Sequence, residues 1–133
     1  MNGTNGVRLS AAGAAVLTVA AGLGVRAAAD GDVAKYAGDA LYTVLIHTLV
    51  VVAAPRVRPP VAAGIALAFS WAVEFTQLTD VPAELAARST AARLVLGSTF
   101  NAPDLFWYGV GAAAAGCAHA WAIRGRVRGR TAG

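Results

Sequence analysis

Three acidic side chains lie within or at the ends of otherwise apolar stretches of the sequence, namely Asp39, Glu74 and Asp104. A carboxyl group can act as a general acid or base, and a carboxylate can accept hydrogen bonds from a bound molecule. A charged side chain costs about 2.5 kcal/mol or more at the middle of a membrane, so such residues normally face a helix-bundle interior or a wet cavity. We therefore expect the three carboxyl groups to share an interior site.

Polar side chains accompany these carboxyl groups at helical spacing. Glu74 shares one helix face with Ser70 and Gln77, which lie four residues before it and three after it. A spacing of three or four residues also joins each of the two aspartates to a tyrosine. Polar stripes on neighbouring helices can meet and form a pocket. The predicted pocket is lined by Asp39, Tyr42, Glu74, Gln77, Asn101, Asp104 and Tyr108.

The same side chains fit a second interpretation, in which they form a polar network that only holds the helices together. The residue pattern leaves both interpretations open. Arg88 and Arg93 are candidate contacts for an anionic group such as a phosphate, because guanidinium groups bind phosphates through paired hydrogen bonds. They could instead pair with Glu74 or Asp104.

The composition indicates which elements position these residues. The chain has 133 residues, of which 57% are hydrophobic and only 14% are charged. This composition is not that of a water-soluble globular protein. Four membrane spans of about 20 residues would use most of the length, which leaves no room for a separate soluble catalytic domain. We expect one integral membrane domain, residues 1–133.

The apolar runs predict four transmembrane helices, over residues 9–28, 36–54, 61–79 and 104–123, followed by an arginine-rich tail over 124–133. The first run also has features of a cleavable secretory signal, but Arg26 lies beside the would-be cleavage site, so we favour a retained span. Pro82 is suitably placed to begin a short helix in the long third loop. The predicted fold is an all-α, four-transmembrane-helix bundle with a short interfacial helix in this outer loop.

The basic residues predict the orientation. Seven arginines fall on the side that holds both chain ends, and the four other basic residues, Arg26, Lys35, Arg88 and Arg93, fall on the opposite side. Both termini are therefore expected in the cytoplasm, in a multi-pass protein of the inner (plasma) membrane. The net charge of +4 and the arginine tail are read as a topology anchor, so no nucleic-acid partner is expected.

The cysteine and histidine residues exclude other chemistry. Cys117 is the single cysteine, so it can form no internal disulfide and no zinc cluster. His47 and His119 show no metal-binding spacing, and we predict no metal and no cofactor. We interpret His47 as a packing residue or as a continuation of a proton path, and His119 as a side chain that reaches toward the membrane surface.

Several short motifs resemble a known family. They are Lys35-Tyr36-Ala37-Gly38-Asp39-Ala40-Leu41, Glu74-Phe75-Thr76-Gln77-Leu78, Leu94-Val95-Leu96-Gly97-Ser98 and Asp104-Leu105. In this order they resemble the bacterial membrane family called domain of unknown function 2809. The resemblance implies a four-helix membrane protein with its first span retained, and it brings no established activity. The sequence also resembles, more weakly, the VanZ-like family, which is associated with glycopeptide resistance. It departs from that family's pattern at Tyr108, where an asparagine is expected.

Three functions remain open from the residues. The pocket could bind a lipid head group or a cell-envelope lipid intermediate, with membrane lipids as the partners. It could belong to a membrane-embedded enzyme on a lipid-linked substrate, with Glu74 as general base and Asp39 or Asp104 as its partner. It could also belong to a small proton-coupled transporter that acts as a homo-oligomer.

Overall fold

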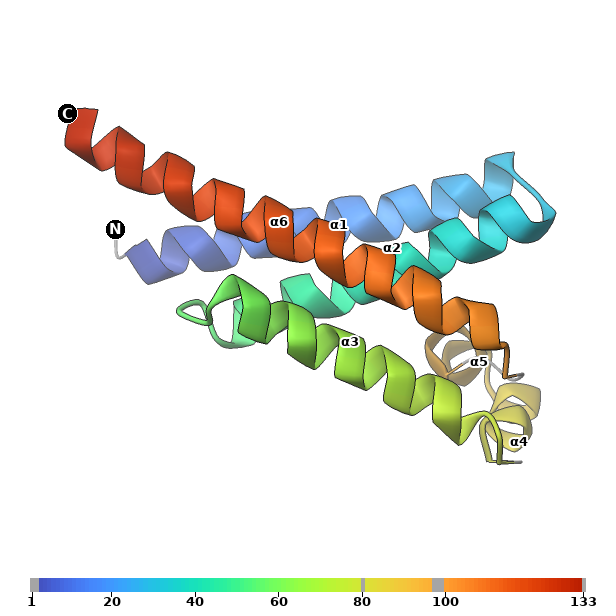
Figure 1. The fold of residues 1–133 in the computed structure, drawn as a ribbon. Helices are drawn as coiled ribbons and strands as arrows, with labels where there is room; N and C mark the ends of the chain where they lie inside the picture. Colours follow the sequence, from blue (N-terminus) through green and yellow to red (C-terminus); the bar gives the residue numbers. More distant parts are fainter. Residues whose placement is uncertain (1–2, 80, 97–99, 133) are drawn as a thin grey trace.

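A computed structural model describes residues 3–79, 81–96 and 100–132. Those residues form helices and connecting turns, without a strand (Figure 1). Asp80, which was predicted in an outer loop, and Gly97 and Ser98, which belong to one of the family motifs, lie outside the described residues.

The described residues form four long helices and two short ones. In chain order they are α1 (Gly3–Ala28), α2 (Gly31–Ala53), α3 (Pro59–Thr76), α4 (Val81–Arg88), α5 (Thr90–Leu96) and α6 (Ala102–Ala132). Each range predicted as a span overlaps a long helix, but α1 begins six and α2 five residues before the predicted limits at residues 9 and 36, and α3 ends three residues before residue 79. The arginine tail predicted over 124–133 continues α6 as helix through Ala132.

Local sequence explains where the helices begin. Gly31 has φ of 61°, a left-handed conformation that glycine adopts without strain, and it makes the tight turn between α1 and α2. Pro59 and Pro60 open α3, where a proline costs no helical hydrogen bond. A short helix expected near Pro82 is present as α4, and α5 is a second short helix that the sequence did not predict.

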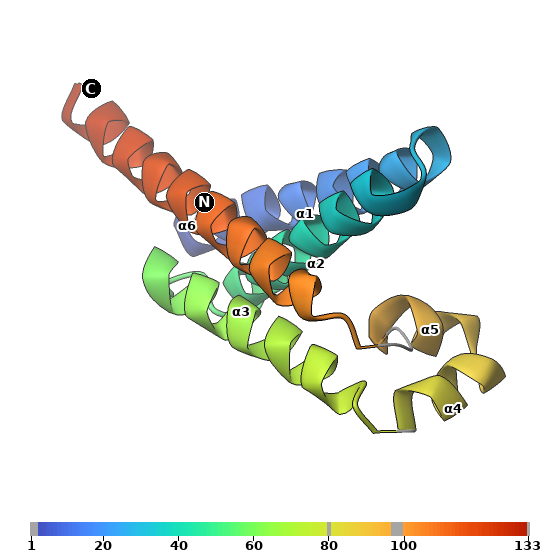
Figure 2. The same cartoon turned by 45° about the vertical axis from the view of Figure 1, so that its right-hand side comes forward.

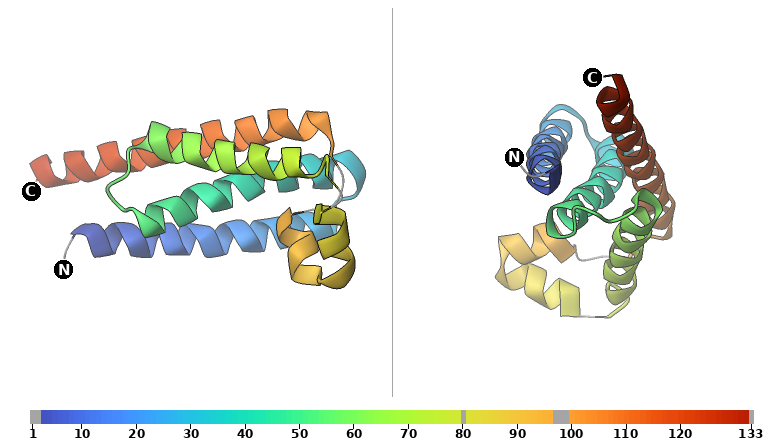
Figure 3. Two further views of the ribbon diagram at one scale, coloured as in Figure 1. Left: turned by 90° about the horizontal axis from the view of Figure 1, so that it is seen from below. Right: turned by 90° about the vertical axis from the view of Figure 1, so that its left-hand side faces the viewer.

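The long helices pack around α2. Helix α1 packs against α2, and α2 also contacts α3 and α6, which contact each other (Figure 2). The short helices α4 and α5 pack on one another at the end of the molecule where α3 stops and α6 begins (Figure 3). Both chain termini lie at the opposite end (Figure 1).

Small residues let α6 approach α2 and α3 closely. A Cβ atom added at Gly111 would overlap the carbonyl oxygen of Ala40 and lie 2.9 Å from its carbonyl carbon, so only glycine fits there. Gly116 faces Ala63 in the same way, with 3.3 Å between the added and existing Cβ atoms. These contacts place the backbone of α6 directly against its neighbours.

The distribution of side chains is the reverse of that in a soluble protein. The largest fully buried side chains are Glu74, Thr43 and Ser70, whereas large apolar side chains such as Leu17 and Trp121 are exposed. Helices α1, α2 and α3 are long and apolar enough to cross a membrane. Helix α6 is not among them, because its glycines, Trp107, Tyr108 and His119 lower the mean hydropathy of its apolar part. Polar residues inside and apolar residues outside are typical of a membrane protein.

Candidate functional site

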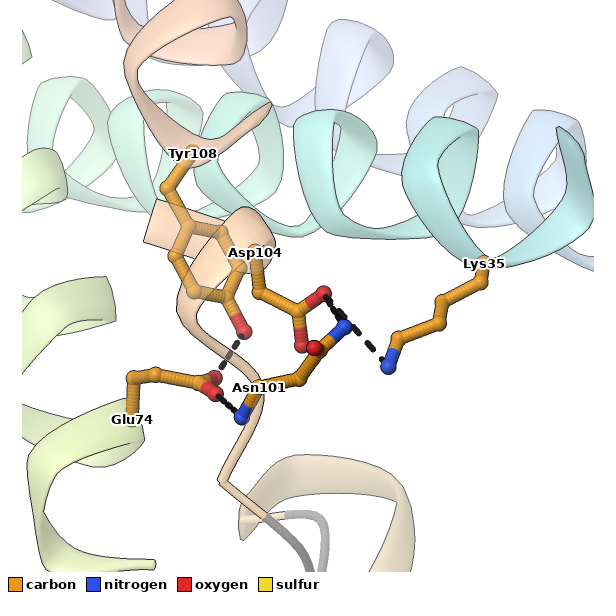
Figure 4. Close-up of polar contacts among 5 residues, drawn as sticks. All are labelled: Lys35, Glu74, Asn101, Asp104 and Tyr108. Carbon is orange, nitrogen blue, oxygen red and sulfur yellow. Dashed lines mark hydrogen bonds and ion pairs between the residues drawn. The ribbon is translucent and has the colours of Figure 1, made fainter. Parts of the chain in front are cut away.

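Glu74 stands at the centre of the polar interior. Its side chain is fully buried near the end of α3. Oε1 accepts a hydrogen bond from the backbone N–H of Asn101 at 2.6 Å, and Oε2 accepts one from the hydroxyl of Tyr108 at 3.0 Å (Figure 4). Both oxygens are therefore occupied, and Glu74 joins α3 to the beginning of α6.

Asn101 and Asp104 organise the first turn of α6. Asn101 precedes the helix, and its side-chain Nδ2 donates to Oδ1 of Asp104 at 2.9 Å (Figure 4). The backbone N–H of Asp104 donates to the carbonyl oxygen of Asn101 at 3.0 Å. Carboxylates are favoured near a helix N-terminus, where unpaired N–H groups carry partial positive charge. This position explains how the buried carboxyl of Asp104 is tolerated.

Lys35 on α2 supplies a cation to the site. Its Nζ lies 3.5 Å from Oδ1 of Asp104, with the lysine side chain 44% exposed and the aspartate 7% exposed. Lys35 was not predicted to belong to the site. The available signal was its position four residues before Asp39, on the same helix face.

Asp39 and Tyr42 carry the uncommitted polar atoms of the site. The carboxyl groups of Asp39 on α2 and Asp104 on α6 line the same cavity. The second oxygen of Asp39 and the hydroxyl of Tyr42 are buried and have no hydrogen-bond partner among the described residues. The ring of Tyr42 lies 6.1 Å from that of Tyr108. A ligand in this site would find these two polar atoms available.

Two further polar pairs continue along the interface. The hydroxyl groups of Thr43 and Ser70 lie 2.8 Å apart, between α2 and α3. Nε2 of His47 lies 3.1 Å from Nδ1 of His119, between α2 and α6, with the rings perpendicular. The spacing of the two histidines in the sequence did not predict this contact. Because Asp39, Thr43 and His47 follow one another at intervals of four residues, they form one polar face of α2.

A cavity of about 600 Å³ opens beside this network. Six of the seven predicted pocket residues line it, and the seventh, Asn101, instead bonds to Glu74 and Asp104. Aliphatic side chains from α1 and α5, such as Leu23 and Leu94, complete the lining.

The basic side chains of the cavity are not the predicted ones. Arg26, at the end of α1, lines the cavity together with Lys35. Arg88 and Arg93 lie exposed on α4 and α5, and neither is among the residues that line it. Within the described part of the chain, no three histidine, cysteine or acidic side chains gather in a way that could hold a metal ion.

The apolar helices and the buried polar site together define an α-helical membrane protein. The family described as "Protein of unknown function (DUF2809)" matches residues 28–112, which cover α2 to α5 and the first part of α6. The chain belongs to this family. No curated protein and no solved structure matches it. The hydrogen-bonded residues around Glu74 lie inside the matched range, whereas Arg26 lies just before it.

Proposed function

We propose that the cavity binds the head group of a membrane lipid or of a lipid-linked cell-envelope intermediate. The observation that carries the proposal is the mixed lining of the cavity. Carboxyl and phenol groups come from α2, α3 and α6, and aliphatic side chains come from α1, α2, α3 and α5. An amphiphilic ligand matches such a lining, because its head group needs polar partners and its chains need apolar ones.

The bonding pattern assigns different roles to the side chains. Glu74 has both oxygens occupied, so it positions Tyr108 and the start of α6. Asp39 and Tyr42 offer their uncommitted atoms to hydroxyl or amino groups of the ligand. Arg26 and Lys35 are placed to meet a phosphate, the role that the sequence analysis gave to Arg88 and Arg93.

The presence of Asp39 and Asp104 in one lining favours a second candidate, an acid–base enzyme that acts on a lipid-linked substrate. Two carboxyl groups in one site can divide the roles of acid and base when their environments differ. In this candidate the general base is Asp39 and not Glu74, because Oδ2 of Asp39 is buried without a partner among the described residues, whereas both oxygens of Glu74 accept hydrogen bonds.

The proposal includes a membrane arrangement. Helix α6 is the fourth span, because it packs along both α2 and α3 and closes the bundle. Helices α4 and α5 lie at the membrane interface with exposed apolar residues such as Leu85 and Val95. Both termini face the cytoplasm of a bacterial cell, and the cavity faces away from it.

The test is the lipid that stays bound during gentle purification. Mass spectrometry of the purified protein is expected to show one lipid class enriched over the surrounding membrane. The Asp39→Asn and Tyr42→Phe variants are expected to lose this enrichment. Val33→Ala, an exposed change on α2 outside the cavity, is the control. Equal lipid content in all variants would overturn the proposal. Turnover of the retained lipid by the wild type, lost in Asp39→Asn, would establish the enzyme.

A further inference from the structure

A second cavity, of about 440 Å³, lies at the end of the molecule that holds both chain termini. It is bordered by the first turns of α1, the turn between α2 and α3, and the last part of α6. Three arginines line it, Arg56 from the turn and Arg126 and Arg130 from α6. We call this cavity the basic cleft.

Among the described residues, no aspartate or glutamate lines the basic cleft. Among the described residues the acidic ones belong to the other end, around the polar site, the α1–α2 turn and α4. Guanidinium groups held near one another repel, and an anion between them would replace that repulsion with attraction. The cleft is therefore electrostatically incomplete without an anion.

The chemistry of the lining specifies the anion. Arginine presents a planar fork of N–H donors that pairs with two oxygens of a phosphate, and three such forks can surround one group. Val7, Ile123 and Val127 line the same cleft and give it an apolar wall. This wall fits the glycerol and first acyl carbons of a phospholipid, although a free phosphate would use the same arginines.

We propose that the basic cleft is a phosphate-binding site, distinct from the cavity beside Glu74. Its ligand is a phosphate-bearing group held by Arg56, Arg126 and Arg130. In the proposed orientation the cleft faces the cytoplasmic leaflet, where anionic phospholipids are concentrated. The site does not depend on the first cavity, because the two share no lining residue.

The chain offers matched controls. Arg124 and Arg128 belong to the same exposed end of α6 but do not line the cleft, so Arg124→Gln/Arg128→Gln removes the same charge as Arg126→Gln/Arg130→Gln. Arg58 is likewise the control for Arg56 in the α2–α3 turn. All six side chains are exposed, so none of the changes disturbs the buried packing.

The experiment measures binding of dioleoyl phosphatidic acid to the purified full-length protein in detergent by native mass spectrometry. Arg126→Gln/Arg130→Gln and Arg56→Gln are expected to weaken binding roughly tenfold or more, because charge-assisted hydrogen bonds are lost. The control variants should change it less than about twofold, since they remove only screened surface charge.

Competition with inorganic phosphate separates the two sources of the ligand. Displacement of the lipid by millimolar phosphate would assign the cleft to soluble phosphates, and resistance would assign it to phospholipid. Both results support a phosphate site. Equal weakening by the cleft variants and their matched controls would show diffuse attraction to the whole arginine-rich end and overturn the proposal, as would unchanged binding in all of them.

Discussion

Tyr108 on α6 donates its phenolic hydrogen to Oε2 of Glu74 on α3, across 3.0 Å in the buried interior. With the N–H of Asn101 on the other oxygen, this bond satisfies a carboxyl group that has no contact with solvent. The pair therefore fixes the position of α6 relative to α3. It also leaves Asp39 and Tyr42, and not Glu74, as the groups with uncommitted atoms that face the cavity.

Two tyrosine substitutions separate stability from binding. Tyr108→Phe leaves Oε2 of Glu74 buried without a donor, and we expect a loss of about 1–2 kcal/mol in the free energy of unfolding. Tyr42→Phe removes a hydroxyl that has no partner among the described residues, so stability should be unchanged or slightly higher. Reversible unfolding in mixed micelles measures both. Equal losses would contradict the bonding pattern around Glu74.

The close contact of α6 with α2 predicts a strong difference between two glycines. Gly111→Ala forces a methyl group into the backbone of Ala40, and we expect a loss of about 1–3 kcal/mol. Gly109 has no atom within 4 Å of the corresponding position, so Gly109→Ala should gain about 0.5–1 kcal/mol from helix propensity. The same unfolding assay compares them, and a neutral Gly111→Ala would show that α6 lies farther from α2.

The ion pair between Lys35 and Asp104 is expected to be weak. Their separation is 3.5 Å, and the partly exposed lysine is screened by solvent. A double-mutant cycle with Lys35→Met and Asp104→Asn should give a coupling energy of about 0.2–1 kcal/mol. Asp104→Asn alone should cost more than this coupling, because it also changes the acceptor for Asn101. A coupling near zero would remove Lys35 from the site.

Labelling tests whether α6 crosses the membrane. In a Cys117→Ala background, Ala102→Cys and Arg128→Cys place single thiols at the two ends of α6, both at exposed positions. A membrane-impermeant maleimide added to intact cells should label Ala102→Cys and spare Arg128→Cys until the cells are lysed. The reverse pattern would invert the proposed orientation, and equal labelling would show that α6 does not span.

Periodicity predicted the polar faces of α2, α3 and α6 because each is a regular helix. The spacing of Ser70, Glu74 and Gln77 puts them on one side of α3, and a carboxyl group in an apolar helix must face inward. The meeting of Glu74 with Tyr108 follows once those faces pack together. The helical character of the long segments was predictable for the same reason.

Other features depend on geometry that one helix does not specify. Arg26 reaches the cavity because the chain reverses direction at Gly31 between α1 and α2, and residue spacing does not specify how far apart the two helices lie. His47 and His119 are 72 residues apart, and their contact depends on the depth at which α6 sits against α2. Arg88 and Arg93 were proposed as anion contacts because they fall on the predicted outer side, where basic residues are unusual, but neither is among the residues that line the cavity.

Helix α1 has a different attachment from the other long helices. It packs principally on α2, whereas the hydrogen bonds around Glu74 and Asp104 join α2, α3 and α6 with Asn101. Removing α1 would strip the cavity of part of its aliphatic wall and of Arg26, yet every bond to Glu74 would remain. The polar network and the enclosure of the cavity are therefore supplied by different helices. Helices α2, α3 and α6 hold the carboxyl groups in position, and α1 encloses the space beside them.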